Sequence, residues 1–173
     1  MRRLLLLVPI LVAVGCSSGS GHSHQVDDKD TRAAIADLFQ KNAAEAPASS
    51  SCDGSLEAKA DATVKCTAND SAGKTWPVTA KVAKVEGDKV DVEAAFDDHV
   101  IGVEDAKAKI AQMYRKIADG EVAGVDCKGV QKLEDNSSRT CTVTETGGKS
   151  VGVTFVVSGV KGNQYSYEVG LSR

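Results

Sequence analysis

The sequence predicts an α+β fold made of two tandem repeats, each with one helix packed on an antiparallel sheet of three to four strands and one disulfide within the repeat. The chain aligns with itself without a gap when Cys52 is placed on Cys127, and 19 of 69 positions are then identical between residues 30–98 and 105–173. In each copy, apolar residues recur with helical spacing and then alternate with polar residues as in half-buried strands. A period of this length indicates two copies of one small domain.

The composition is that of a small globular protein. The chain has 173 residues, of which 42% are hydrophobic, and its 21 basic and 24 acidic side chains give a net charge of −3. Proteins that bind nucleic acids usually gather an excess of Lys and Arg to contact phosphates, so we expect no nucleic-acid partner. Only three Phe, three Tyr and one Trp are present, and the core must therefore consist mainly of Val, Ala, Ile and Leu.

The N-terminal residues 1–15 predict a lipoprotein signal peptide. Arg2 and Arg3 precede an apolar run over residues 4–14, which is shorter than the roughly 20 residues that a membrane-spanning helix needs. The run ends in Val-Ala-Val-Gly before Cys16, which resembles a bacterial lipobox and implies cleavage before this cysteine and diacylation of its sulfur. An ordinary secretory signal would instead leave a free Cys16 thiol. The lipobox also explains the odd number of cysteines, since four of the five then remain for disulfides.

This leader implies a location for the protein. We expect the acylated Cys16 to anchor it in the cell membrane, on the extracytoplasmic face, without crossing the bilayer. Residues 16–28 are mostly Ser, Gly, His and Asp, which predicts a flexible tether. Residues 29–100 and 101–173 are then the two predicted repeats.

Each repeat is predicted to begin with an amphipathic helix. In the first, Asp30 or Thr31 can cap the helix and Pro47 prevents its continuation; in the second, Asp105 takes the capping position and the helix ends near Gly120. A narrow apolar stripe of this kind usually packs on the sheet of its own domain, although a partner-binding face is the alternative. The stripes consist of Ile35, Leu38, Phe39 and Ala43 in the first repeat and of Ile110, Met113, Tyr114 and Ile117 in the second.

Alternating strand segments follow each helix. Trp76 lies at an inward position of its segment, so it is expected in the core rather than at an interface. The inward positions of the first repeat are Val64, Cys66, Trp76, Val78, Ala80, Val82, Val90, Val92, Ala94 and Phe96. Those of the last two segments of the second repeat are Val151, Val153, Phe155, Val157, Tyr165, Tyr167, Val169 and Leu171.

The four remaining cysteines occupy equivalent positions in the two repeats. Four cysteines allow three pairings, and the repeat favours Cys52 with Cys66 and Cys127 with Cys141. On the chain-entropy model each such loop contributes about 3 kcal/mol to stability. A zinc site would need closely spaced cysteines or nearby histidines, so we expect no metal and no other cofactor.

The sequence offers little catalytic chemistry. Beyond the predicted tether the only histidine is His99, and the cysteines are expected to be oxidised, so neither a Ser-His nor a Cys-His pair is indicated. His22 and His24 could hold a divalent metal weakly, but a flexible segment is not a preformed site. We therefore expect no catalytic residues and no enzymatic activity.

The order of these features resembles a known family. A lipobox and a polar tether are followed by a helix, a first cysteine, a strand carrying the second cysteine (residues 64–67 and 139–142), a Gly-Lys turn and a Val-rich hairpin around Gly87 or Gly162. This order resembles the uncharacterised Cys-pair domain of actinobacterial, especially mycobacterial, cell-envelope lipoproteins, although no Pro follows Cys52 or Cys127 directly. The resemblance implies a location and a fold but no activity. The tandem layout also loosely resembles the secreted β-lactamase inhibitory protein, which binds through a surface richer in aromatic residues.

Together these observations predict a lipid-anchored, non-enzymatic module of the cell envelope that has a structural role or binds an envelope protein or polymer. The alternative is a carrier or sensor of a small apolar envelope ligand held between the repeats. Such a carrier needs a cavity of several hundred Å³.

Overall fold

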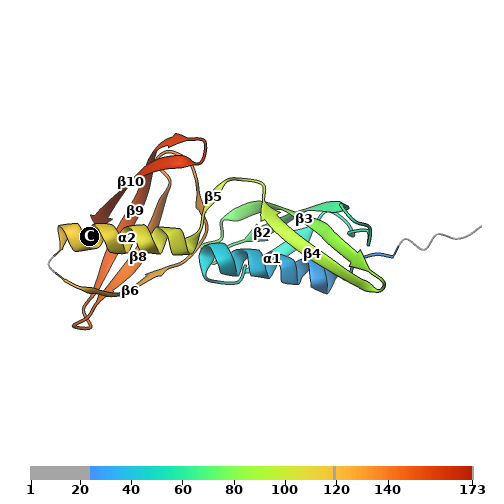
Figure 1. The fold of residues 1–173 in the computed structure, drawn as a ribbon, viewed down its shortest axis with the longest axis horizontal. Helices are drawn as coiled ribbons and strands as arrows, with labels where there is room; N and C mark the ends of the chain where they lie inside the picture. Colours follow the sequence, from blue (N-terminus) through green and yellow to red (C-terminus); the bar gives the residue numbers. More distant parts are fainter. Residues whose placement is uncertain (1–23, 119, 173) are drawn as a thin grey trace, which may run out of the picture.

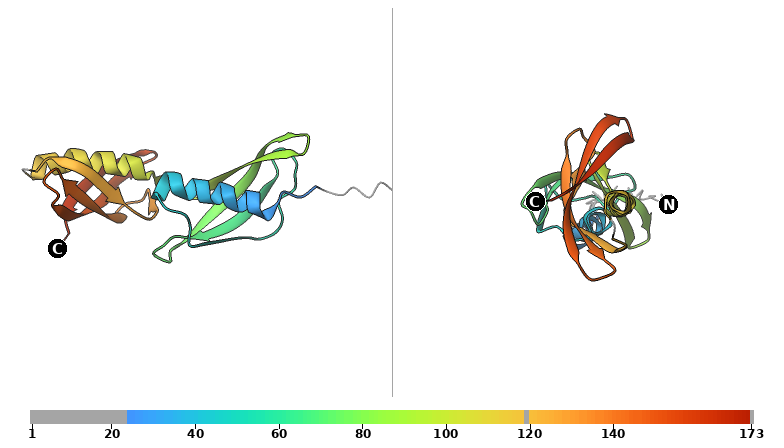
Figure 2. Two further views of the ribbon diagram at one scale, coloured as in Figure 1. Left: turned by 90° about the horizontal axis from the view of Figure 1, so that it is seen from below. Right: turned by 90° about the vertical axis from the view of Figure 1, so that its left-hand side faces the viewer.

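The computed structural model describes residues 24–118 and 120–172 and contains two repeats that lie end to end (Figure 1). The two helices run in the same direction along the long axis, each with its own sheet beside it (Figure 2). The predicted signal peptide, Cys16 and residues 17–23 of the predicted tether lie outside the described residues. Neither helix in the described ranges is long and apolar enough to cross a membrane.

The predicted α+β fold is confirmed, with four antiparallel strands in each main sheet. The first repeat contains α1 (Asp28–Ala43), β1 (Ser49–Cys52), β2 (Thr63–Asn69), β3 (Thr75–Glu86) and β4 (Lys89–Phe96), and its sheet has the order β1-β2-β3-β4. The second contains α2 (Val103–Ile117), β6 (Val122–Cys127), β8 (Ser138–Glu145), β9 (Ser150–Lys161) and β10 (Gln164–Leu171), in the order β6-β8-β9-β10. A further pair joins β5 (Val100–Ile101) to β7 (Gln131–Lys132). The strands β9 and β10 begin and end at the positions equivalent to those of β3 and β4.

Both repeats begin earlier in the chain than the sequence predicts. The carbonyl of His24 accepts a hydrogen bond from Ala58 N at 2.6 Å, and at the equivalent place in the second repeat the carbonyl of His99 accepts one from Leu133 N at 2.8 Å. Val26 is buried in the first core. The predicted tether therefore extends too far, because backbone hydrogen bonds and a single apolar side chain suffice to bring a polar segment into the fold. The first repeat is accordingly taken as residues 24–98 and the second as 99–172.

The helix starts also differ from the predicted ones. The N-cap of α1 is Asp27, whose carboxylate accepts a hydrogen bond from Lys29 N at 2.9 Å. Thr31 lies inside the helix and is buried. The N-cap of α2 is Gly102, which offers no side-chain bond. Acidic residues cluster at the start of each helix, at positions 27, 28 and 30 for α1 and at positions 104 and 105 for α2, so composition alone does not single out the capping position.

Each helix packs on its own sheet, as predicted. Most predicted stripe residues are buried or half-buried, but Ile117 is 49% exposed because α2 ends there. Trp76 is 1% exposed and lies in the first core, as expected. The first core consists of Val26, Ile35, Phe39, Ala43, Leu56, Cys66, Ala68, Trp76, Val78, Ala80, Val82 and Val130. The second consists of Ile101, Val103, Ala106, Ile110, Tyr114, Cys127, Cys141, Val143, Val153, Phe155, Val157 and Val169.

The predicted disulfides are confirmed. Cys52 is bonded to Cys66, and Cys127 is bonded to Cys141. In both repeats the two half-cystines are directly opposite each other on neighbouring strands, with Cα–Cα distances of 3.9 and 4.4 Å. Each bond therefore links the outermost strand, β1 or β6, to the rest of its sheet.

Direct contacts fill the junction between the repeats. Glu45 Oε1, just after α1, accepts hydrogen bonds from Gly129 N at 3.1 Å and from Ser71 Oγ at 2.8 Å. Val130 packs into the first core although it belongs to the second repeat, and Ala44 packs against the second core. These contacts hold the two repeats end to end.

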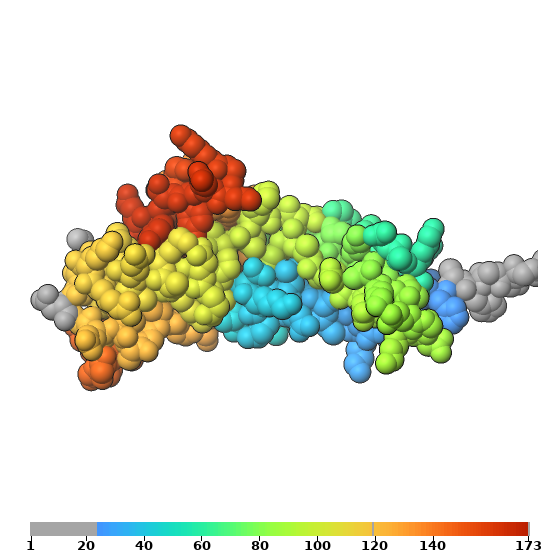
Figure 3. All heavy atoms as spheres, viewed as in Figure 1, coloured from blue at the N-terminus to red at the C-terminus, as the bar shows by residue number. Residues whose placement is uncertain are grey.

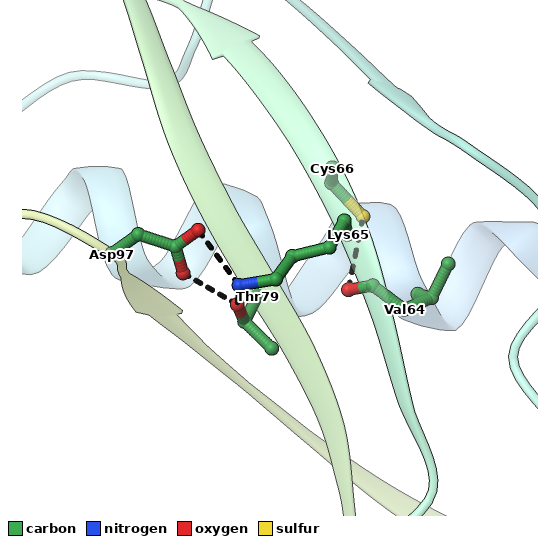
Figure 4. A network of polar contacts seen from close by, with 5 residues as sticks. All are labelled: Val64, Lys65, Cys66, Thr79 and Asp97. Carbon is green, nitrogen blue, oxygen red and sulfur yellow. Dashed lines mark hydrogen bonds and ion pairs between the residues drawn. The ribbon is translucent and has the colours of Figure 1, made fainter.

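A polar network lies on the exposed face of the first sheet (Figure 4). Asp97 accepts hydrogen bonds from Thr79 Oγ1 at 2.5 Å and from Lys65 Nζ at 2.9 Å. The hydrogen bonds from Thr79 and then Lys65 lower the pKa of Asp97 below its usual range. The ionised carboxylate is thus the form that the folded state favours.

This network predicts a pH-dependent contribution to stability. Because the pKa of Asp97 is lower in the folded chain, its contribution is complete above about pH 4 and is lost as the pH falls through the folded pKa. Asp97→Asn should therefore lower the melting temperature at pH 7, at a cost below about 1 kcal/mol since solvent screens the site. The difference from the parent should shrink toward pH 2 in thermal unfolding. A difference that stayed constant across this range would contradict the assignment.

Candidate functional site

The second repeat carries polar and aromatic side chains at positions where the first repeat has apolar ones. Lys109 lies on α2, Gln131 on β7, Arg139 on β8, and Tyr165 and Tyr167 on β10. The equivalent pairs are Ala34 and Lys109, Leu56 and Gln131, Val64 and Arg139, Val90 and Tyr165, and Val92 and Tyr167. Because the first repeat forms the same fold with the apolar set, the fold itself does not require the polar one.

Two of these side chains, Lys109 and Tyr165, border an open hollow of about 700 Å³ between α2 and the β9–β10 hairpin. Figure 3 shows this hairpin, in red, standing above the yellow α2. Gly159 has a φ of 58°, and the register of the hairpin shifts between Gln164 and Ser166, so a β-bulge shapes this end. The lining residues are Lys109, Gly159, Lys161, Asn163, Gln164, Tyr165 and Ser166, and we name the feature the Tyr165 hollow.

A hydrogen-bonded cluster forms one wall of the Tyr165 hollow. The Tyr165 hydroxyl donates to Asp105 Oδ2 at 2.5 Å, and Lys109 Nζ donates to Asp105 Oδ1. Lys109 Nζ also lies 5.2 Å from the ring centroid of Tyr165 and 5.8 Å from that of Tyr167, within the range of cation–π attraction. The cluster therefore fixes the ring of Tyr165 at the edge of the hollow.

The pKa values of this cluster follow from its contacts. Burial tends to raise the pKa of Asp105, but the hydrogen bonds from Lys109 and Tyr165 outweigh burial and lower it. Burial, followed by the hydrogen bond to Asp105, raises the pKa of Tyr165. At neutral pH the carboxylate is therefore ionised and the tyrosine hydroxyl remains a hydrogen-bond donor.

Arg139 and Gln131 are buried polar side chains in the same repeat. Arg139 is 5% exposed and its Nη2 donates to the carbonyl of Ile101 at 3.2 Å, whereas Nε and Nη1 have no hydrogen-bond partner within the described chain. Gln131 is 2% exposed, and its Oε1 also lacks a partner among these residues. Burial lowers the pKa of Arg139 to about 10. Unsatisfied buried groups of this kind destabilise a fold.

The residues that the sequence singled out do not make up this site. The four cysteines form structural disulfides, Cys16 and His22 lie outside the described residues, and His24 and His99 accept backbone hydrogen bonds through their carbonyls. The polar replacements were missed, although a position-by-position comparison of the two repeats would have revealed Arg139 opposite Val64. Their burial was not visible in the sequence.

Comparisons with known proteins give a family without a function. Two segments, residues 11–87 and 90–162, each match the family described as Domain of unknown function (DUF4333). No curated protein and no solved structure matches the chain. The two matched segments cover most of the sequence. The chain therefore belongs to the DUF4333 family and contains two tandem copies of its domain.

Proposed function

We propose that the protein is a non-enzymatic lipoprotein of an actinobacterial cell envelope, anchored to the extracytoplasmic face of the cell membrane by acylated Cys16, and that its second repeat binds an envelope partner. The lipobox-like segment before Cys16 supports the anchor. The two disulfides fit an oxidising compartment outside the cytoplasm.

The main support for a binding role is that the second repeat has polar or aromatic residues where the first repeat has apolar ones. A buried guanidinium with two unpaired nitrogens costs stability, and the first repeat folds with Val64 at the equivalent position. Arg139 is therefore a poor choice for folding alone. Its presence in the same repeat as the Tyr165 hollow supports a role in shaping or charging a surface for a partner.

The position of the second repeat suits such a role. The N-terminal end of the first repeat lies on the side away from the second repeat (Figure 2). With an anchor at Cys16, the first repeat would therefore follow the membrane anchor directly, and the second repeat would be farther along the chain from the membrane. The Tyr165 hollow would then face other components of the envelope.

The chemistry of the Tyr165 hollow favours a polymer over a protein as its occupant. Lys161, Asn163 and Gln164 offer hydrogen-bond donors, and Tyr165 adds an aromatic ring. Hydroxyl and carboxylate groups are the acceptors that such donors suit, and a polymer of acidic or neutral sugars presents both. We therefore expect an acidic or hydroxyl-rich polymer to bind here.

A carrier that holds a small apolar ligand between the repeats is supported less. At the junction, Glu45 is hydrogen-bonded to Gly129 and Val130 packs into the first core. A ligand at this place would have to displace these contacts.

In-cell photo-crosslinking tests the proposed function. A photoreactive residue in place of the exposed Asn163 should yield an adduct that contains sugar, after extraction of the full chain with its disulfides intact. The matched control places the same residue at Asp88, the equivalent exposed position of the first repeat, and should yield little adduct. Equal adducts at both positions, or none at either, would contradict the proposal. A protein adduct confined to Asn163 would make the partner a protein.

The double replacement Gln131→Leu with Arg139→Val, which installs the residues of the first repeat, provides a second prediction. Removing a buried, incompletely paired charge should leave the free energy of unfolding unchanged or raise it by about 1–4 kcal/mol, as measured by urea unfolding. The adduct formed at position 163 should decrease. The reverse exchange, Leu56→Gln with Val64→Arg, is the control and should destabilise the first repeat. A large loss of stability in the first double variant would make Arg139 a structural residue.

A further inference from the structure

A tryptophan fills one end of the first core. The Trp76 indole is buried, and its Nε1 donates to Asp70 Oδ2 at 2.9 Å. Lys74 Nζ lies 4.2 Å from the indole centroid, and the Phe96 ring meets the indole at a centroid distance of 5.8 Å. A carboxylate, a cation and an aromatic ring thus surround this indole.

The equivalent end of the second core has smaller side chains. Val151 replaces Trp76 and Leu171 replaces Phe96. An open hollow of about 450 Å³ lies there, and Leu171 at its edge is 59% exposed. The hollow, which we name the Tyr114 hollow, is lined by Tyr114, Ala118, Gly120, Glu145, Lys149, Val151 and Leu171.

The lining of the Tyr114 hollow matches the indole site of the first repeat. Apart from Gly120, each residue that lines the Tyr114 hollow is equivalent to Trp76 or to a residue of the first repeat near the Trp76 end of its core. These first-repeat residues are Phe39, Ala43, Asp70, Lys74, Trp76 and Phe96. The carboxylate and the ammonium group are both kept, as Glu145 and Lys149. The second repeat therefore retains the polar surroundings of an indole but lacks the indole itself.

The Glu145 carboxylate accepts one side-chain hydrogen bond and can accept a further donor. Its Oε1 accepts the Tyr114 hydroxyl at 2.7 Å, and no other side-chain hydrogen bond reaches Glu145 from residues 24–118 or 120–172. A Cβ at Gly120 would come within 2.6 Å of the Glu145 carboxyl group, so glycine leaves the room that this side chain occupies. The first-repeat residue equivalent to Gly120 is Glu45, which accepts a hydrogen bond from Gly129 N at the junction between the repeats.

We propose that the Tyr114 hollow binds a tryptophan side chain of another polypeptide, with the ring N–H directed to Glu145 and the ring near Lys149. The only tryptophan of this chain is Trp76, which is buried, so a second copy of the protein does not supply the side chain. This is a separate site from the Tyr165 hollow, and it goes beyond the proposed function.

Titration of the full chain with N-acetyl-tryptophanamide tests this inference. Methyl signals of Val151 and Leu171 should shift in NMR spectra, with a Kd of about 1 mM, as expected for a small fragment. N-acetyl-phenylalaninamide lacks the ring donor and should bind about tenfold more weakly. Equal affinities, or no shift of either methyl group at tenfold the expected Kd, would overturn the proposal.

Two variants sharpen the test. Val151→Trp should fill the hollow and weaken probe binding by about tenfold or more, whereas Glu168→Trp, which adds the same ring at an exposed position of β10, should not. Glu145→Gln keeps the side-chain size and should reduce the preference for the tryptophan probe several-fold. It also provides a readout should Val151→Trp fail to fold. Unchanged probe binding in a folded Val151→Trp, or an unchanged preference in Glu145→Gln, contradicts the site.

The outcome is separable from that of the proposed function. Crosslinking from position 163 should be unaffected by Val151→Trp, since residue 151 does not line the Tyr165 hollow. Failure of the probe to bind would refute the tryptophan site alone. Failure of the crosslink would refute the polymer site alone.

Discussion

Replacement of Trp76 by Val, the residue that the second repeat has at this position, should lower the free energy of unfolding by about 3 kcal/mol or more. The change removes a fully buried ring that packs against Phe96 and leaves the buried Asp70 without its indole donor. Urea unfolding followed by far-ultraviolet circular dichroism measures this loss.

Trp76→Phe separates the two causes. It keeps a ring in the core but removes the N–H that reaches Asp70, so it should retain part of the stability and cost about 1–3 kcal/mol. A loss below about 1 kcal/mol for Trp76→Val would show that the first core closes readily around a smaller side chain. The indole site would then be a weak template for the Tyr114 hollow.

Removal of the second disulfide, by Cys127→Ala with Cys141→Ala, should destabilise the second repeat by about 3 kcal/mol on the chain-entropy model. The bond ties β6, the outermost strand, to β8. The first repeat should stay folded because each repeat has its own buried core. Hydrogen exchange read by mass spectrometry would locate the loss of protection.

The matched control is Cys52→Ala with Cys66→Ala, which should open the first repeat instead. If either pair of substitutions removed protection equally from both repeats, the two cores would behave as one cooperative unit. The coupling would then run through the junction, where Val130 packs into the first core and Ala44 against the second.

Most of the architecture could be predicted because the two repeats of the chain can be aligned with each other. The gap-free alignment of the chain with itself predicts two similar domains and makes Cys52 equivalent to Cys127. The errors fall at segment ends. The His24 and His99 segments join the sheets through backbone bonds, which have no side-chain signature, and Ile117 is exposed because α2 ends there.

The repeat, the disulfide pairing and the helix-plus-sheet unit could be predicted from the amino-acid sequence, since they depend on residue spacing along the chain. The incomplete pairing of the buried Arg139, and the open Tyr114 hollow where the first repeat holds an indole, are visible only in the folded chain. Burial and open space depend on side chains that distant segments bring together, and on the volume they leave unfilled.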